Sequence, residues 1–444
     1  MSNSLVNICF FSAVGCVNVF AQASFSPLST GVNSGPGQPF LFADSTNNTV
    51  YLGGWISSVG NTPVQGMARW NGIAWDSMGS GVTPRAIVNY NGEIIVGGTY
   101  GSPTNHPSGR GLSKWNGNAW VPFADAVSSS GWGCVDGLLV DNNNLYVFGC
   151  FDSIDGVPAN MIAKFDGSAW NTFPVLDTAY GGGVIYSAAI YNNELFVGGN
   201  FEFPYQSGRG EIAKWDGTTW QQVGNGITGS LASVGSLKVF NNELWVGGGF
   251  ETAWGDSGNY LMKWNGNNWI QLPCEPNGFV QCLEVYNGKV YAGGSFNVPS
   301  ISNGSWTARW DSSGQCESYG SFDNGPTSSF TTMNGDIYIG GGFTTVNGDT
   351  MNRITKYNDG PLDVNSQIAR DNSPVYPNPC DGHFWVTDFG VASIYNVMGD
   401  KIWNGVVNGM TQIDLSSSPP GIYFLEIHSE QTCRTQQFVI HQSN

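Results

Sequence analysis

A sequence unit that occurs seven times limits this chain to a repeat fold. Its clearest copy spans residues 193–220 and reads NELFVGGNFEFPYQSGRGEIAKWDGTTW. The β-branched and aromatic runs predict strands, and the doublet Gly198-Gly199 marks a place where another backbone packs too closely for a side chain. Asp216-Gly217 would supply the positive φ values of a tight hairpin before Trp220. With the apolar run at residues 184–191, the unit contains four antiparallel strands.

The seven copies keep a common register. Successive doublets lie 44 to 51 residues apart. A four-stranded unit that repeats at about this spacing is typical of β-propeller blades, so the sequence predicts an all-β, seven-bladed β-propeller. The doublets are Gly53-Gly54, Gly97-Gly98, Phe148-Gly149, Gly198-Gly199, Gly247-Gly248, Gly293-Gly294 and Gly340-Gly341.

The seventh copy ends near Gly360 and lacks the usual fourth strand. The missing piece occurs at the other end of the chain, where Ser24–Val32 aligns with Ala74–Val82. We therefore expect residues 24–32 to be the outer strand of the last blade, which closes the propeller over residues 24–360 and removes open sheet edges. The alternative is that this segment is a frayed terminus.

The first 23 residues are typical of a signal peptide. An apolar stretch from Leu5 to Phe20 precedes Ala21-Gln22-Ala23, the small-x-small pattern of a cleavage site, although no Lys or Arg comes before it. No later stretch is apolar for long enough to predict a transmembrane segment. Residues 361–373 lose the repeat and are interpreted as a linker to a second domain at residues 374–444.

Charge and cysteine content restrict the partners and the compartment. The formal net charge is -17 and no basic stripe is visible, which argues against a nucleic-acid partner. Export permits disulfides. Cys274 with Cys282 and Cys380 with Cys433 are the expected pairs, although connectivity stays open at this stage.

The repeats resemble kelch-type repeats, in which a glycine doublet is followed by two aromatic residues across a short turn. In the clearest copy these are Gly198-Gly199, Trp215 and Trp220. The resemblance covers residues 24–360 and implies a fold. It does not imply a function, because such propellers include both enzymes and binding proteins.

The last 70 or so residues look like the type A sorting domain of the type IX secretion system. The resemblance rests on VYPNP from Val375, IYNVMG from Ile394, PGIYF from Pro420 and QFVI at the end. It implies a small β-sandwich that an outer-membrane translocon recognises, with export through the periplasm to the medium or the cell surface. A sandwich that only caps the propeller is the alternative. The sorting residues it implies are Tyr376, Pro377, Asn378, Pro379, Gly382, Gly399, Gly421 and Tyr423.

The sequence predicts no catalytic, metal or cofactor site. His106 is the single histidine of the repeat region, and no hydrolase, zinc or phosphate-loop motif occurs. Paired carboxylates would suit glycoside hydrolysis. However, Asp166 and Asp216 share one turn position with Asn71, where either residue type forms a hairpin, so we interpret them as turn formers.

The aromatic residues divide into two groups. Those at repeat positions are expected to pack between blades. Trp132, Trp254, Trp306, Tyr100 and Tyr205 fall outside the repeat, near the variable loops that follow the doublets. Because variable loops on a rigid scaffold carry binding sites, these five are the candidate ligand-binding residues, with scattered surface aromatics as the alternative. The repeat-position residues are Trp70, Trp75, Trp115, Trp120, Trp170, Trp215, Trp220, Trp264, Trp269 and Trp310.

These features favour a secreted or cell-surface, non-catalytic binding protein whose ligand is a glycan or a protein. A glycoside hydrolase or lyase on the same scaffold is the first alternative, and a structural or adhesion protein is the second. Two carboxylates about 5 to 10 Å apart at the mouth of the central channel would favour the enzyme.

Overall fold

The computed structural model describes two compact units, one of residues 23–359 and one that includes residues 360–444. The predicted signal peptide (1–23) and linker (361–373) lie outside the described residues. Those residues are 24–34, 39–98, 111–128, 133–176, 183–202, 210–228, 232–250, 252–253, 256–257, 259–359, 375–376, 380, 382–386, 389–396, 400–408, 411–428 and 433–441.

In the larger unit, the described residues form seven sheets that contain the same antiparallel order of four strands. From first strand to last they are β3 (Phe40–Asp44), β4 (Thr49–Gly53), β7 (Met67–Trp70) and β8 (Trp75–Ser77); β9 (Pro84–Tyr90), β10 (Glu93–Gly98), β11 (Gly111–Trp115) and β12 (Trp120–Val127); β13 (Val135–Asp141), β14 (Asn144–Gly149), β17 (Ile162–Phe165) and β18 (Trp170–Thr172); β19 (Val184–Tyr191), β20 (Glu194–Glu202), β21 (Gly210–Trp215) and β22 (Trp220–Gln222); β24 (Val234–Phe240), β25 (Glu243–Gly248), β28 (Leu261–Trp264) and β29 (Trp269–Gln271); β30 (Phe279–Tyr286), β31 (Lys289–Asn297), β32 (Ser305–Trp310) and β33 (Cys316–Glu317); and β35 (Thr327–Met333), β36 (Asp336–Gly341), β39 (Ile354–Asn358) and β1 (Ser24–Pro27).

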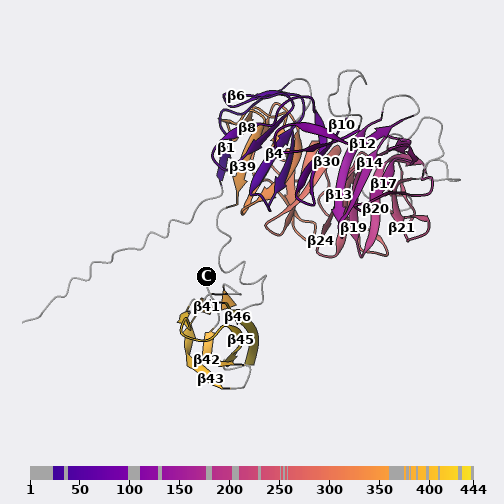
Figure 1. The fold of residues 1–444 in the computed structure, drawn as a ribbon. Coiled ribbons are helices and arrows are strands. Elements are labelled where there is room, and N and C mark those ends of the chain that lie inside the picture. Colours follow the sequence, from indigo (N-terminus) through magenta and orange to yellow (C-terminus); the bar gives the residue numbers. More distant parts are fainter. Residues whose placement is uncertain are drawn as a thin grey trace, which may run out of the picture. The chain divides into compact units, whose positions relative to one another are not determined.

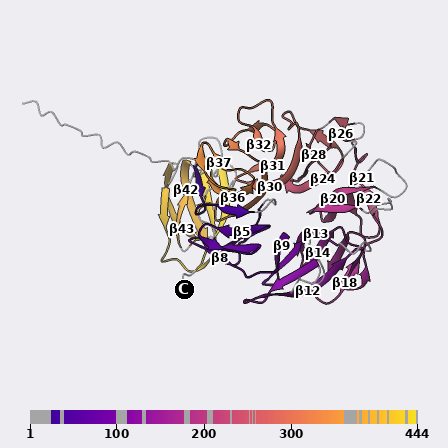
Figure 2. The same cartoon turned by 90° about the horizontal axis from the view of Figure 1, so that it is seen from above.

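The first strand of each sheet is the innermost one. Each innermost strand contacts the innermost strand of the next sheet, and β35 of the last sheet contacts β3 of the first. Figures 1 and 2 show the sheets arranged around a common centre, with no helix among the described residues. The unit is therefore a propeller-like all-β fold.

The glycine doublets are sites of close backbone approach, as predicted. A Cβ on Gly198 would lie 2.3 Å from Cγ1 of Val234 in the next sheet, and one on Gly199 would lie 2.0 Å from the carbonyl oxygen of Val184. The third copy has Phe148 in place of the first glycine. Gly137 faces it, and a Cβ there would lie 1.9 Å from the Phe148 ring. The third copy therefore has a large residue at the doublet and a glycine opposite it, so the space between the two strands is still filled.

The hairpins between third and fourth strands differ in detail from the prediction. Trp215 pairs with Trp220 across a loop of residues 216–219, and of Asp216 and Gly217 only Gly217 has a positive φ, +100°. Asp216 Oδ1 instead accepts hydrogen bonds from the Thr218 and Thr219 amides, both at 2.8 Å. Asn71, Asn116, Asp166 and Asn265 do the same in other copies, which confirms them as turn formers.

The repeat tryptophans belong to the core or stack against it, as predicted. Six are buried: Trp75, Trp120, Trp220, Trp264, Trp269 and Trp310. The half-buried Trp70, Trp115, Trp170 and Trp215 each lie beside an aromatic ring across the hairpin, with ring centroids 5.0 to 5.3 Å apart. Cross-strand aromatic pairs of this kind stabilise each sheet at its outer edge.

The N-terminal strand pairs with the last sheet over a shorter stretch than predicted. Ser24–Pro27 (β1) runs antiparallel to β39, with Ser24 opposite Asn358. Val32, the predicted end of this strand, belongs instead to β2 (Val32–Ser34), which pairs with β5 (Ile56–Val59) of the first repeat. The chain crosses from the last sheet to the first between these two strands.

Short hairpins follow the doublet in four repeats, where we expected only loops. Each pairs with the strand that enters from the preceding sheet and so ties neighbouring sheets together. Asp155-Gly156 and Asn347-Gly348, at two of the four turns, were an available signal. They are β5 with β6 (Thr62–Pro63), β15 (Ser153–Ile154) with β16 (Val157–Pro158), β26 (Thr252–Ala253) with β27 (Asp256–Ser257), and β37 (Thr345–Val346) with β38 (Asp349–Thr350); their partners are β2, β12, β23 (Ile227–Thr228) and β34 (Phe322–Asp323).

Neither of the two pairings considered from the sequence forms, and the connectivity left open there is now given by the structure. Cys274 bonds to Cys316, and Cys134 bonds to Cys150. Cys282 keeps a free thiol because it lies in the innermost strand β30, opposite Gly293, and away from the connection that holds Cys274. Cys380 bridges Ile440 in the C-terminal unit. Cys433 lies seven residues earlier in that strand, roughly 23 Å away along it, which is too far for a bond.

The C-terminal unit contains two sheets around one apolar core. The core combines Phe384 and Val386 of the first sheet with Leu425 and Phe438 of the second. The predicted strands around GIYFLEI and QQFVI are present and paired. The first sheet holds β40 (Val375–Tyr376), β41 (His383–Val386) and β44 (Thr411–Asp414), and the second holds β43 (Lys401–Asn408), β42 (Phe389–Asn396), β45 (Gly421–His428) and β46 (Cys433–Ile440).

Within the described parts of both units, no helix is long and apolar enough to cross a bilayer.

Candidate functional site

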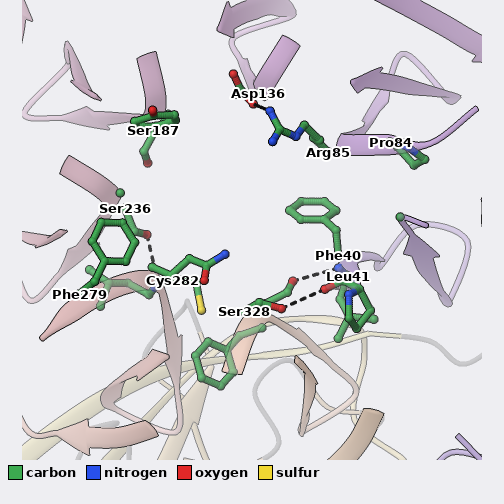
Figure 3. Close-up of a pocket in the computed structure, with 18 of the residues that line it drawn as sticks. Phe40, Leu41, Pro84, Arg85, Asp136, Ser187, Ser236, Phe279, Cys282 and Ser328 are labelled. Atoms are coloured by element: carbon green, nitrogen blue, oxygen red, sulfur yellow. Dashed lines mark hydrogen bonds and ion pairs between the residues drawn. The ribbon is translucent and has the colours of Figure 1, made fainter. Parts of the chain in front are cut away.

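A cavity of about 710 Å³ lies at the centre of the larger unit. All seven innermost strands contribute to its lining. Figure 3 shows Phe40, Ser187, Ser236, Cys282 and the Arg85–Asp136 pair around the opening. Its lining comes from the beginnings of these strands, at the same end as the glycine doublets that close the second strands. This is the end from which the variable loops leave the sheets.

A β-bulge in six of the seven innermost strands determines which side chains reach the cavity. In each of them one residue is skipped in the pairing with the doublet, as Arg85 is between Pro84 and Ala86. A bulge releases a residue from the alternation of a strand and redirects its side chain. All six bulge residues line the cavity: Arg85, Asp136, Tyr186, Gly235, Gln281 and Ser328.

The residues on either side of each bulge serve the scaffold. The preceding residue packs against the doublet of the previous sheet, as Val234 does against Gly198. The following residue is small, and where it is serine it ties two sheets together. The Leu237 amide donates to Ser187 Oγ at 2.9 Å, and the Leu41 amide donates to Ser329 Oγ at 2.9 Å. The scaffold therefore restricts these neighbours more than the bulge residues, although Ser328 Oγ also donates to the Pro39 and Gly340 carbonyls and a Cβ on Gly235 would lie 3.0 Å from the Val280 carbonyl oxygen.

Two bulge residues form an ion pair in the cavity wall. Arg85 Nη1 donates to Asp136 Oδ1 at 2.5 Å. The Asp136 side chain is 9% exposed and that of Arg85 is 56% exposed. The buried carboxylate therefore anchors the more exposed guanidinium in the cavity wall. Burial raises the pKa of Asp136, and the charge and hydrogen bond of Arg85 oppose that rise. Arg85 and Asp136 are the only charged residues among the described residues of the lining.

Aromatic side chains form the rim of the cavity. Trp55 is 64% exposed and follows directly after Gly53-Gly54, while Tyr186 is partly exposed. Phe40, Phe279 and Phe330 complete the aromatic part of the described lining. Trp55 therefore presents a large apolar ring to solvent next to the cavity.

The predictions from sequence missed Trp55, Arg85, Asp136 and Tyr186, although two signals were present. The position after the doublet holds a small or polar residue in the other copies, such as Asn200, and Trp55 departs from this pattern. In six of the seven innermost strands a variable residue also comes directly before a small residue, and in five of these six it follows an apolar residue. That variable residue is the bulge.

The described structure includes one of the five aromatics predicted to bind a ligand, so that prediction stays untested. Trp132, Trp254, Tyr100 and Tyr205 lie outside the described residues. Trp306 lies at the start of β32 with a φ of +66° and is partly buried against an aromatic cluster that includes Tyr291. It is not among the described residues that line the cavity.

Three of the predicted sorting residues have a visible structural role. Gly382 has a φ of +97°, and a Cβ there would lie 2.6 Å from Ser416 Cα, so only glycine fits. Tyr423 donates from its hydroxyl to the Pro419 carbonyl at 2.7 Å, and Gly421 pairs with Ile440. Tyr376 lies in β40. Pro377, Asn378, Pro379 and Gly399 lie outside the described residues.

Comparisons with known proteins identify the C-terminal unit. Residues 374–441 match the family described as "Secretion system C-terminal sorting domain". No curated protein matches the chain. Among solved structures, the β-propeller domain of the trilobed protease from Pyrococcus furiosus, reported to have an open velcro topology, is similar at 12% identity with a TM-score of 0.41. The similarity covers 72% of this chain and 93% of that one.

Proposed function

Because residues 374–441 are a sorting domain of the type IX secretion system, which sends its cargo to the cell surface or the medium, we propose that this chain is an exported binding protein. Its sorting domain engages the secretion translocon. Its propeller binds a glycan or protein ligand without chemical conversion, and the central cavity holds that ligand. The signal peptide predicted at residues 1–23 would direct the first step of export, and the two C-terminal sheets would form the expected β-sandwich.

The proposal includes a closed ring of seven blades of the kelch-like type. Two contacts between the first and last sheets support it. The Leu41 and Ala43 amides of β3 donate to Ser329 Oγ and Thr331 Oγ1 of β35, each at 2.9 Å. The pairing of β1 with β39 would then join the two ends of the chain within one blade. A closed ring keeps the cavity lining rigid, which lowers the entropic cost of binding.

The single observation that carries the binding function is the ring of bulge residues. A repeated scaffold presents a different residue from six of its seven sheets to one cavity, and five of these residues carry side chains. Glycoside hydrolysis requires two carboxylates about 5 to 10 Å apart. Asp136 is the one carboxylate among the described lining residues, and Arg85 holds it in an ion pair. These features favour binding over the hydrolase or lyase alternative.

The test is an array of glycans and polysaccharides probed with the purified full-length chain, with release of reducing ends measured in the same samples. Binding without release is the expected result. Release of reducing ends would replace the proposal with the enzyme alternative. If the chain neither binds a glycan nor releases reducing ends, the glycan-binding form of the proposal is contradicted. That result would favour a protein ligand or a structural role.

A further inference from the structure

We infer that the central cavity takes an uncharged saccharide, which stacks one sugar ring on Trp55 and hydrogen-bonds through its hydroxyls beside the Arg85–Asp136 pair. The inference rests on the binding function proposed above and narrows it to one class of ligand. It also assigns the binding to residues of the first four repeats, Trp55, Arg85, Asp136 and Tyr186.

The charges in the cavity favour a neutral ligand. Arg85 and Asp136 cancel each other, and the other described lining residues carry no formal charge. An anionic ligand would compete with Asp136 for Arg85 and would leave two negative groups close together in a partly buried place. It would also approach a protein of net charge -17. A cationic ligand would meet a carboxylate that Arg85 already neutralises.

The hydrogen-bonding groups of the lining suit hydroxyls, which both donate and accept. Arg85 uses one nitrogen for Asp136, and its planar fork carries further N–H donors. Ser187 and Ser236 accept backbone amides through Oγ, a role that leaves their O–H hydrogens available to donate. Gln281 adds an amide that donates and accepts. A ligand with many hydroxyls can satisfy such a mixed lining, whereas an apolar ligand would leave it unpaired.

The rim supplies the apolar contact that a sugar ring needs. Trp55 is 64% exposed, although indole is among the side chains most readily buried when a contact is available. The C–H face of a pyranose ring covers such a surface, and Tyr186 offers a second ring at the same mouth. The cavity volume of about 710 Å³ falls within the range of roughly 300 to 1,000 Å³ that small-ligand sites occupy.

The test uses isothermal titration calorimetry on the full-length chain. The probes are neutral hexasaccharides of glucose, xylose, mannose and N-acetylglucosamine, with hexagalacturonate as the anionic counterpart. We expect at least one neutral probe to bind about tenfold or more tightly than hexagalacturonate. Trp55→Ala and Arg85→Gln should each weaken that binding about tenfold, which corresponds to roughly 1.4 kcal/mol.

Ile73→Ala is the matched control, because Ile73 is 87% exposed on a turn outside the lining and should leave affinity unchanged. Thermal melting of each variant separates lost binding from lost folding. A preference for hexagalacturonate, or full affinity in Trp55→Ala, would overturn the inference and leave the binding function in place. Failure of every saccharide to bind would overturn both the inference and the glycan form of the proposed function.

Discussion

Arg309 is the most heavily engaged charged residue of the larger unit. It occupies the position that holds Lys or Arg in every repeat, but its side chain is 11% exposed. Its Nη1 donates to Asp359 Oδ1 and to the Tyr291 hydroxyl, each at 2.7 Å. Burial opposes ionisation of Asp359, but hydrogen bonds from Tyr357 and Arg309 outweigh it, so the pKa of Asp359 lies below its ordinary value. The cluster joins the sixth sheet to the end of the seventh.

We expect Arg309→Leu to lower the free energy of unfolding by about 3–5 kcal/mol at pH 7, because it leaves Asp359 buried without its partner. Urea denaturation measures the loss. Since the pKa of Asp359 is lowered in the folded protein, its contribution is present above the ordinary Asp pKa of about 3.9 and disappears as pH falls through the folded value. The difference between variant and wild type should therefore shrink in acid.

Arg69→Leu is the control, because Arg69 occupies the same repeat position in a half-exposed pair with Asp76 at 3.5 Å. That change should cost less than about 1 kcal/mol. Equal losses for the two variants would contradict the special role assigned to the Arg309 cluster.

The sheets depend on close contact between each doublet and the next innermost strand. Gly198→Ala would place a methyl group 2.3 Å from Val234 Cγ1. Overpacking of this kind costs typically about 1–3 kcal/mol. The double variant Gly198→Ala/Val234→Ala removes the clashing methyls, so we expect the two losses in unfolding free energy to be less than additive in a double-mutant cycle. Strict additivity would show that the two positions do not press on each other.

Local spacing made the sheets predictable. Three features depend on neighbours within about 20 residues and could therefore be predicted from the local sequence. They are the glycine doublets, the Asp-Gly and Asn-Gly turns and the paired tryptophans. The bulges were not predicted, because a bulge is a property of the register between two strands. Arg85 and Asp136 looked like ordinary strand residues until the pairing was known. The Cys274–Cys316 bond was missed for a similar reason, since Cys316 reaches Cys274 only through the sheet. Cys134 and Cys150 are 16 residues apart, so their bond was missed although its spacing is local.

The whole propeller depends on two ends of the chain that are more than 300 residues apart. Phe25 of β1 lies 4.6 Å from Tyr357 and 5.6 Å from Phe322, measured between ring centroids. The repeat count and the N-terminal match predicted this pairing from sequence, but not its end at Pro27 or the crossing to the first sheet. The contents of the central cavity stayed unpredicted, because a repeat pattern does not tell which non-repeating residues share one space.

Phe25→Ala should lower the free energy of unfolding of the whole larger unit by about 2 kcal/mol. The same substitution at a fully buried phenylalanine typically costs about 3–5 kcal/mol. If the ring is one cooperative structure, hydrogen exchange should accelerate in β35, β36 and β39 and also in β3 and β4 across the seam. Val175→Ala, at an exposed apolar side chain, should change neither quantity. Acceleration limited to β1 would indicate an open ring that tolerates loss of its last strand.

The bulges separate most of the residues that join neighbouring sheets from the residues that line the central cavity. A bulge residue has no partner in the ladder, so we expect exchange of Tyr186 or Gln281 to alter recognition with little effect on stability. Arg85 and Asp136 depend on each other through their ion pair, and Ser328 Oγ donates to the Pro39 and Gly340 carbonyls, so these three positions are more constrained. Evolution can therefore change the ligand of such a protein one position at a time without passing through unfolded intermediates. Tyr186 and Gln281, with Arg85 and Asp136 exchanged as a pair, define a compact library for engineering new receptors on this chain.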